Sequence, residues 1–321
     1  MSNLLEVSHL KKYFKTPAGM LHAVDDVSFS IPQGQTLGVV GESGCGKSTL
    51  GRVVLGLLDA TEGSIAFDGQ EVTNASGRRR KALRKDMQLI FQDPFSSLNP
   101  RMCVFDLIAD PIRIYKLAKS KEDLQQQVFS LMDTVGLARR LAYAYPHELD
   151  GGRRQRIGIA RALSLEPRFI VCDEPVSALD VSIQAQILNL LQDLQEEKGL
   201  TYIFITHDLS VVKHISNEIL VMYLGTVVEK CEADELFDRP LHPYTKGLLS
   251  AIPIPSLDVH RKRIIMQGEL TSPVEPKPCC RFASRCPYAT EQCHAQQPPL
   301  EEVAPGHQVA CFRIRELPIR K

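Results

Sequence analysis

The feature that most constrains this chain is an apolar segment that runs into a glycine-rich turn and then into a helical pattern. Thr36–Val40 reads as a buried strand, and helical periodicity extends from Ser48 to Leu58. The turn between them reads Gly41-Glu42-Ser43-Gly44-Cys45-Gly46-Lys47-Ser48. This is the P-loop pattern, in the strand-turn-helix context that the motif requires. The segment predicts an α/β protein with a phosphate site where the helix begins.

The residue types in this turn suit phosphate chemistry. Glycines let successive backbone N–H groups point at one anion, and the start of the following helix favours negative charge. We expect Lys47 to place its charge on the outer phosphates, Ser48 to bind Mg²⁺ through its hydroxyl, and Thr49 to complete the site. The alternative, a glycine-rich turn that matches by chance, is disfavoured by the flanking strand and helix.

A second signal lies at the end of another apolar strand. Phe169–Cys172 is fully apolar and is followed by Asp173 and Glu174, which would place both carboxylates at the carboxyl edge of the sheet, where such folds bind ligands. Two solvated acids at a strand end are the alternative. Beside a P-loop, we expect Asp173 to hold Mg²⁺ and Glu174 to accept the proton of the attacking water.

The rest of the pattern indicates a parallel sheet covered on both faces, because buried strands alternate with helices. Short strands are also expected between Leu4 and Ile31 and at Gly63–Phe67. The other expected elements are helices within 104–138, 155–165 and 183–197 and a strand at 202–205. Proline density rises past Pro253, so we place a domain boundary there, with a first domain at 1–253 and a C-terminal region at 254–321.

With these motifs in place, the chain resembles the ATPase subunits of ABC transporters over nearly its whole length. The resemblance implies a P-loop fold with a parallel core sheet, an antiparallel β subdomain, a helical subdomain at about 93–165, and a small irregular cysteine-rich extension. It also implies that Gln92 is the Q-loop glutamine, which senses Mg²⁺ and the membrane partner. Asp180 resembles the D-loop aspartate and His207 the switch histidine, which contacts the γ-phosphate. Phe14 fits the aromatic residue that stacks on adenine, with Tyr13 as the alternative.

The segment at the family signature departs from the usual Leu-Ser-Gly-Gly-Gln. Asp150 stands where the family has serine, followed by Gly151, Gly152 and Arg153. In this family two nucleotide domains pair head to tail and each signature covers the partner's nucleotide, so Asp150 would present an anion to the γ-phosphate. Arg153 could compensate by engaging Asp150 or the phosphate. We hypothesise an asymmetric heterodimer; the alternative is that Asp150 is a tolerated variant.

Two further segments resemble the peptide branch of the family, the dipeptide, oligopeptide and nickel importer ATPases, and most of all its second, F-type subunit. They are Phe91–Arg101 and Arg239–Thr245, and the tail segment Gly268–Pro273 agrees with them. The tail cysteines follow the spacing C-x5-C-x6-C-x17-C. The resemblance implies a 4Fe-4S cluster on Cys280, Cys286, Cys293 and Cys311. Cys279 is an alternative first ligand, and zinc, disulfides or free thiols remain open.

Charge and hydropathy exclude other classes. The chain has 38 basic and 38 acidic side chains, so it lacks the basic excess of a general nucleic-acid-binding surface. A basic run at 78–85 is interpreted as a solvated helix face rather than a nucleic-acid patch, since no aromatic residues interleave with it. No apolar stretch is long enough to span a membrane and the N-terminus lacks a signal pattern. We expect a peripheral subunit at the cytoplasmic face of the membrane.

The resulting expectation is an ATPase subunit that couples ATP binding, dimerisation and hydrolysis to uptake of dipeptides or oligopeptides. ATP and Mg²⁺ are the expected cofactors. The expected partners are a second ATPase, two transmembrane permeases and, indirectly, an extracytoplasmic binding protein. A nickel or other small-solute importer is the alternative. Rivals of another class are a soluble ABC-type ATPase of DNA repair or translation and an ATP-regulated iron-sulfur protein; the first would need a long coiled coil or a second P-loop, which the sequence lacks.

Overall fold

Strands β1 (Asn3–Thr16) and β2 (Gly19–Pro32) form a long antiparallel hairpin, where the sequence predicts only short strands. Register shifts interrupt the pairing at several points, which explains why no clean alternation marks the whole length. Strand β4 (Glu62–Phe67) pairs with β1, and β5 (Gln70–Glu71) completes a four-stranded antiparallel sheet of order β2-β1-β4-β5. The predicted strand at Gly63–Phe67 is confirmed.

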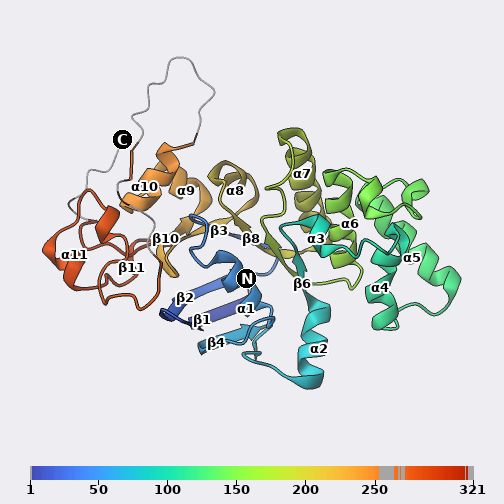
Figure 1. Cartoon of the computed structure of the whole chain (residues 1–321), viewed down its shortest axis with the longest axis horizontal. Helices are drawn as coiled ribbons and strands as arrows, with labels where there is room; N and C mark the ends of the chain where they lie inside the picture. The colour runs from blue at the N-terminus through green and yellow to red at the C-terminus, as the bar shows by residue number, and fades with distance from the viewer. Residues whose placement is uncertain (1, 253–263, 267, 269–271, 315, 317–321) are drawn as a thin grey trace, which may run out of the picture. The chain divides into compact units, whose positions relative to one another are not determined.

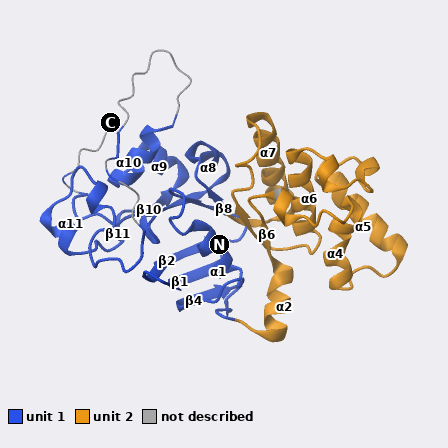
Figure 2. Cartoon of the chain, in the orientation of Figure 1, with its two compact units in different colours: residues 1–74, 204–321 blue, residues 75–203 orange. Residues whose placement is uncertain are grey.

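The computed structural model of the chain (Figure 1) describes all residues except 1, 253–263, 267, 269–271, 315 and 317–321. The described residues divide into two compact units, 1–74 with 204–321 (unit 1) and 75–203 (unit 2), coloured separately in Figure 2. The predicted domain boundary at Pro253 and positions 269–271 of the peptide-branch tail segment lie outside the described residues.

Unit 1 contains the strand that precedes the P-loop. Strand β3 (Thr36–Val40) lies where the apolar run predicts it and pairs in parallel with β9 (Glu218–Tyr223). Strand β10 (Thr226–Glu232) is antiparallel to β9, and the tail adds a hairpin of β11 (Glu301–Ala304) and β12 (His307–Val309), with β12 paired to β10. The sequence did not predict this hairpin. Tail and P-loop therefore belong to the same unit.

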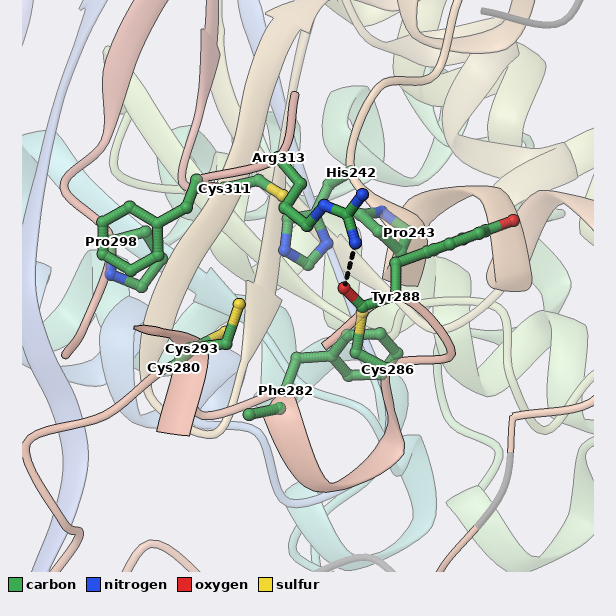
Figure 3. Close-up of a pocket in the computed structure, with 12 residues that line it drawn as sticks. His242, Pro243, Cys280, Phe282, Cys286, Tyr288, Cys293, Pro298, Cys311 and Arg313 are labelled. Carbon is green, nitrogen blue, oxygen red and sulfur yellow. Dashed lines mark hydrogen bonds between the residues drawn. The ribbon is translucent and has the colours of Figure 1, made fainter. Parts of the chain in front are cut away.

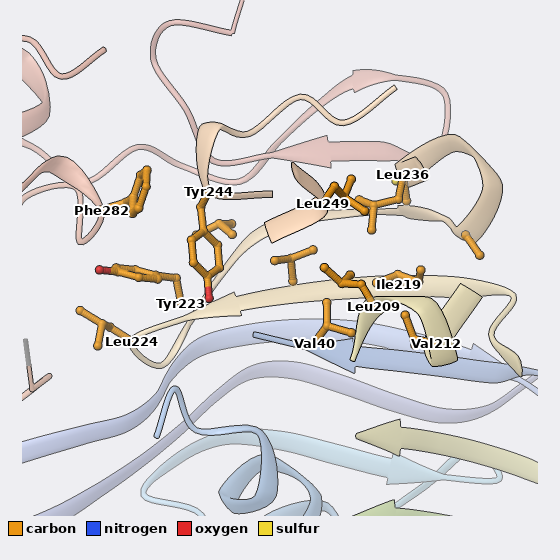
Figure 4. Packing of buried hydrophobic residues seen from close by; sticks show 14 residues of the cluster. Val40, Leu209, Val212, Ile219, Tyr223, Leu224, Leu236, Tyr244, Leu249 and Phe282 are labelled. Atoms are coloured by element: carbon orange, nitrogen blue, oxygen red, sulfur yellow. The ribbon is translucent and has the colours of Figure 1, made fainter. Parts of the chain in front are cut away.

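Helices and strands of unit 1 share one apolar cluster (Figure 4), in which Tyr223, Tyr244 and Phe282 lie at one end. Phe282 comes from the tail, so the cysteine-rich segment contributes to this core. The helices that contribute residues to it are α8 (Leu209–Ile215), α9 (Ala233–Asp238) and α10 (Pro243–Ser250). Unit 1 also contains α1 (Lys47–Val54), α11 (Glu291–Ala295) and a 3₁₀ turn, η3 (Ala283–Arg285).

Unit 2 has two parallel strands, β6 (Met87–Ile90) and β7 (Phe169–Asp173), and most of the helices predicted from periodicity. The long helical region at 104–138 is divided into two helices. The helices are α2 (Gly77–Asp86), α3 (Pro94–Ser97), α4 (Val104–Ile114), α5 (Lys121–Thr134), α6 (Gly151–Leu163) and α7 (Val181–Lys198), with 3₁₀ turns η1 (Arg139–Leu141) and η2 (Pro146–Glu148). Strand β8 (Thr201–Thr206) crosses the boundary between the units.

The sequence predicts a solvated basic helix face and no membrane-spanning segment. None of the residues of α2, which carries the basic run, is buried, as a solvated helix face requires. Across the described ranges, no helix is both long and apolar enough to cross a membrane.

Candidate nucleotide and cysteine sites

The P-loop turns through backbone conformations that only glycine adopts easily. Gly46 has φ of 105° and Gly41 has φ of 152°. A Cβ atom on Gly46 would lie 2.0 Å from the Ala23 carbonyl oxygen, and one on Gly41 would lie 2.2 Å from that of Met222. Glycine is therefore required at both positions by backbone angle and by close approach of neighbouring chain. Helix α1 begins directly after Gly46.

Lys47 is held inside this turn. Its Nζ donates to the carbonyl oxygens of Gly41 at 2.7 Å and Glu42 at 3.0 Å, and the residue is 4% exposed. The adjacent Ser43 and Gly44 are exposed, while Ser48 and Thr49 are half-buried. The ammonium is thus fixed at the start of α1, among backbone N–H groups that can bind an anion.

Cys45 lies within the same turn but faces the interior. It is 1% exposed, and burial raises the pKa of its thiol. A protonated, buried thiol packs against its neighbours and does not act as a nucleophile.

The two aromatic candidates for adenine stacking differ in their surroundings. The Tyr13 ring is stacked on His22, with centroids 3.8 Å apart, and its hydroxyl donates to Asp25. Phe14, next to it on β1, has the Lys12 ammonium 4.9 Å from its ring centroid. Tyr13 is therefore already engaged on one ring face and at its hydroxyl.

His207 immediately follows β8 and is exposed. Its position is set by the next residue, because Asp208 accepts a hydrogen bond from the Ser210 N–H at 2.8 Å and caps α8. His207 therefore lies between the end of β8 at Thr206 and the cap of α8 at Asp208.

In unit 2 the parallel register brings Gln92 and Glu174 together. Ile90 is paired with Cys172, and each of the two site residues lies two positions further along its own chain segment. The Gln92 amide donates to the Glu174 carboxylate at 2.9 Å. Glu174 has φ of 47°, and Asp173 before it is 2% exposed. The Q-loop glutamine and the predicted general base are thus in contact, an association that the sequence did not specify.

The signature segment packs against the start of α7, just after Asp180. Asp150 caps α6 by accepting from the Arg153 N–H at 2.8 Å, and the Arg153 Nε lies 3.4 Å from the same carboxylate. Of the two compensations proposed for Arg153, the structure shows the one through Asp150. A Cβ on Gly152 would lie 2.6 Å from a methyl of Ile183. Asp180 in turn caps α7 through the Ile183 N–H at 2.9 Å.

Four tail cysteines surround one small cavity (Figure 3). Cys280, Cys286, Cys293 and Cys311 all line it, together with His242 and Phe282, whereas Cys279 does not. Burial raises the pKa of the thiols of Cys280, Cys286 and Cys311. Within the described ranges, no three His, Cys, Asp or Glu side chains are arranged to hold a single metal ion. Neither this arrangement of side chains nor the similarity to known proteins described below supports the predicted iron-sulfur cluster.

Sequence reasoning missed two arginines of the tail. Arg285 forms an ion pair with Glu42 of the P-loop, and Arg281 forms one with Asp25, the residue that also binds Tyr13. Because 243 residues separate Arg285 from Glu42, no local pattern could indicate the pair.

Comparison with known proteins agrees with this geometry. The ABC transporter family matches residues 24–177, and the oligopeptide/dipeptide transporter C-terminal region matches residues 228–293. Among solved structures, the chain resembles cbiO1 of Clostridium perfringens, part of the ABC transporter complex cbiONQ, with a TM-score of 0.66 and 27% identity over 74% of this chain and 91% of that one. It also resembles the dimeric, ADP- and phosphate-bound cassette MJ0796, with a TM-score of 0.66 and 29% identity over 71% of this chain and 98% of that one. The fold and the motifs define an ATP-binding cassette ATPase.

Relatives that match nearly the whole chain define a narrower family within the ATP-binding cassette ATPases. The chain is 53% identical to the putative oligopeptide transport ATP-binding protein YkfD of Bacillus subtilis, over 97% of this chain and 96% of that protein. It is 51% identical to the oligopeptide transport ATP-binding protein OppF of Escherichia coli, over 97% and 94%. The chain belongs to the oligopeptide/dipeptide branch of ABC transporter ATP-binding subunits. It binds and hydrolyses ATP as a peripheral subunit of a membrane transporter.

Proposed function

We propose that this subunit drives the import of oligopeptides or dipeptides. The observation that carries the proposal is the near-complete match to oligopeptide transport ATP-binding proteins, which includes the peptide-type C-terminal region. The subunit would act at the cytoplasmic face, on two permease subunits that receive peptide from an extracytoplasmic binding protein. The test is ATP-driven uptake of a labelled oligopeptide by the assembled transporter. Uptake of nickel, but not of peptide, would favour the alternative cargo.

We further propose a division of roles within the nucleotide site. Lys47 and the P-loop amides stabilise charge on the phosphates, and Phe14, whose neighbour Tyr13 is already engaged, stacks on adenine. Ser48, Gln92 and Asp173 are the Mg²⁺ ligands, directly or through water; oxygen donors of this kind suit a hard cation that keeps several waters.

Glu174 is the proposed base for the attacking water, and His207 contacts the γ-phosphate. The Gln92 amide donates to the Glu174 carboxylate at 2.9 Å, and this hydrogen bond orients the carboxylate. A movement of Gln92 that the membrane partner causes would therefore also move the Glu174 carboxylate. This contact supports a direct coupling between partner and hydrolysis.

The dimer partner is proposed to be a related but different ATPase. Asp150 is negatively charged and stands at the signature position that covers the partner's γ-phosphate in this family. Its carboxylate is 58% exposed and paired with Arg153 at 3.4 Å, so the repulsion is reduced but not removed. Such a site suits a heterodimer in which the nucleotide under this signature is hydrolysed slowly.

Asp150→Ser tests the asymmetry. Serine retains the ability to cap α6 and removes the negative charge, so we expect hydrolysis at the partner's nucleotide to rise by about three- to tenfold. Single-turnover hydrolysis with Glu174→Gln in this chain would report the partner's nucleotide alone. Asp193→Ser, a removal of charge from the exposed side of α7, is the control. An unchanged rate at the partner's nucleotide would refute the asymmetry.

The tail is proposed to hold a 4Fe-4S cluster. The support is the chemistry of the donors: thiolates are the usual ligands of such clusters, and four cysteines of the tail line one cavity, with Cys280 rather than Cys279 among them. Their protons would leave as thiolates form on binding. When bound, the cluster would link the four cysteine positions through iron-thiolate bonds.

Anaerobic purification provides the test. We expect broad visible absorbance and about four iron and four sulfide per chain, as a 4Fe-4S cluster requires. Cys293→Ser should abolish the spectrum, and Cys279→Ser should leave it intact. Stoichiometric zinc without iron would refute the cluster.

A further inference from the structure

The cysteine-rich tail contacts the P-loop through one arginine. Arg285 ends the 3₁₀ turn that precedes Cys286, and its guanidinium forms two parallel hydrogen bonds with the Glu42 carboxylate, at 2.6 Å and 3.1 Å. The side chains of Arg285 and Glu42 are 7% and 20% exposed. A bidentate pair this well shielded is stronger and more specific than an ion pair in open solvent.

The backbone of Glu42 is held by a second contact, with a tyrosine that packs on the tail. Its N–H donates to the Tyr244 hydroxyl at 2.9 Å, and the Tyr244 ring is buried against Tyr223 and the tail residue Phe282 (Figure 4). Tyr244 belongs to the segment Arg239–Thr245 that resembles the peptide branch. The structure gives this segment a role, because its tyrosine supports the start of the P-loop.

Buried polar contacts position the tyrosine in turn. The Glu229 carboxylate is fully buried and accepts from the N–H groups of Leu241 and His242, at 2.7 Å and 3.0 Å. His307 from the tail contacts the same carboxylate at 2.8 Å. The turn that carries Tyr244 is therefore itself tied to the tail, and both supports of Glu42 depend on the C-terminal region.

Glu42 poses an electrostatic problem for nucleotide binding. Its carboxylate belongs to a loop that binds phosphate, and its carbonyl oxygen lies 3.0 Å from the Lys47 Nζ. A carboxylate on this loop without a counter-charge would repel the phosphates. Arg285 neutralises that charge and keeps the side chain turned toward the tail.

We propose that Arg285 is a positioning residue for ATP: it neutralises Glu42 and holds its carboxylate away from the phosphates, so that the C-terminal region completes the P-loop. The inference rests on the ATP-binding role of the P-loop and is independent of the transported cargo. A second link supports it, since Arg281 of the same tail segment binds Asp25 and the Leu224 carbonyl.

Charge-removing variants of the purified transporter separate this role from packing. Arg285→Gln should raise the dissociation constant of ATP by about tenfold, because Glu42 loses its counter-charge. Glu42→Gln should lower the dissociation constant by about threefold, because a negative charge leaves the phosphate-binding loop and the charge of Arg285 is no longer cancelled. The dissociation constant of the double variant should lie between those of the two single variants. For Arg285→Gln, hydrolysis at saturating ATP should change by less than about twofold, which distinguishes positioning from catalysis.

If Arg285→Gln also disturbs the packing of the tail, the dissociation constant of the double variant distinguishes charge neutralisation from a role in packing. A role in packing alone predicts that adding Glu42→Gln restores nothing, and that result would overturn the proposal, as would an unchanged dissociation constant in Arg285→Gln. Arg285→Lys keeps the charge and should lose less affinity than Arg285→Gln. Arg239→Gln, at an exposed arginine paired only weakly with Glu235 at 4.0 Å, is the matched control. Failure of the wild-type complex to take up peptide would not affect these comparisons.

Discussion

Replacing Glu174 with glutamine should lower the rate of ATP hydrolysis at this chain's P-loop by about two to four orders of magnitude, the usual contribution of a general base. The glutamine side chain has nearly the same shape but does not accept the proton of the attacking water. Binding should persist, because the phosphate-binding turn and Lys47 belong to a different segment of the chain. The variant should therefore retain ATP after purification, which nucleotide extraction and chromatography would measure.

The control for Glu174→Gln is Glu197→Gln, the same change at an exposed position in the last turn of α7. This control should hydrolyse ATP at the wild-type rate. Near-normal hydrolysis by Glu174→Gln in single-turnover assays would remove Glu174 from the role of base. Loss of bound nucleotide together with hydrolysis would instead indicate a role in binding.

Replacing Lys47 with alanine should weaken ATP binding by about two orders of magnitude or more. The buried ammonium contacts the carbonyl oxygens of Gly41 and Glu42 at the start of α1, where the phosphates are proposed to bind. Removing it deletes charge-assisted hydrogen bonds to the phosphates and leaves those two carbonyls without that donor. Equilibrium binding of a labelled ATP analogue to the purified transporter would measure the effect.

Lys85→Ala is the matched control for Lys47→Ala, because Lys85 is exposed on α2. It should bind ATP as the wild type does. Thermal unfolding without nucleotide should show whether Lys47→Ala has lost the fold as well as the site. A folded Lys47→Ala protein with wild-type affinity would contradict the assignment of the P-loop.

Local signals explain what could be predicted from the sequence. Thr36–Val40 and the glycine-rich turn carry their information within a few residues, and the structure has the strand and the helix start where they are expected. The helix ends earlier than predicted, at Val54, because Gly56 adopts a positive φ of 63° and terminates it. The periodicity of the following leucines suggested a continuation that this backbone conformation prevents.

Contacts between distant segments could not be predicted. The Gln92 and Glu174 contact depends on the register of two parallel strands, and the Arg285 and Glu42 pair depends on how the tail packs beside β9 and α10. The local sequence marks Gln92, Glu174 and the turn that contains Glu42, but it does not indicate which residues they contact, and it carries no signal at Arg285. The resemblance to a family supplied a role for Gln92, and the strand-end position beside a P-loop supplied one for Glu174. Neither gave a role to Arg285, because its contact with Glu42 arises from tertiary packing.

The measurement that tests the central claim most directly is peptide uptake by the complete transporter in sealed vesicles, with ATP on the side of this subunit. The account predicts that a labelled oligopeptide accumulates only with ATP, and that Glu174→Gln abolishes accumulation while Glu197→Gln does not. Peptide accumulation that continues unchanged with Glu174→Gln, or ATP hydrolysis by the wild-type complex without any peptide movement, would contradict it.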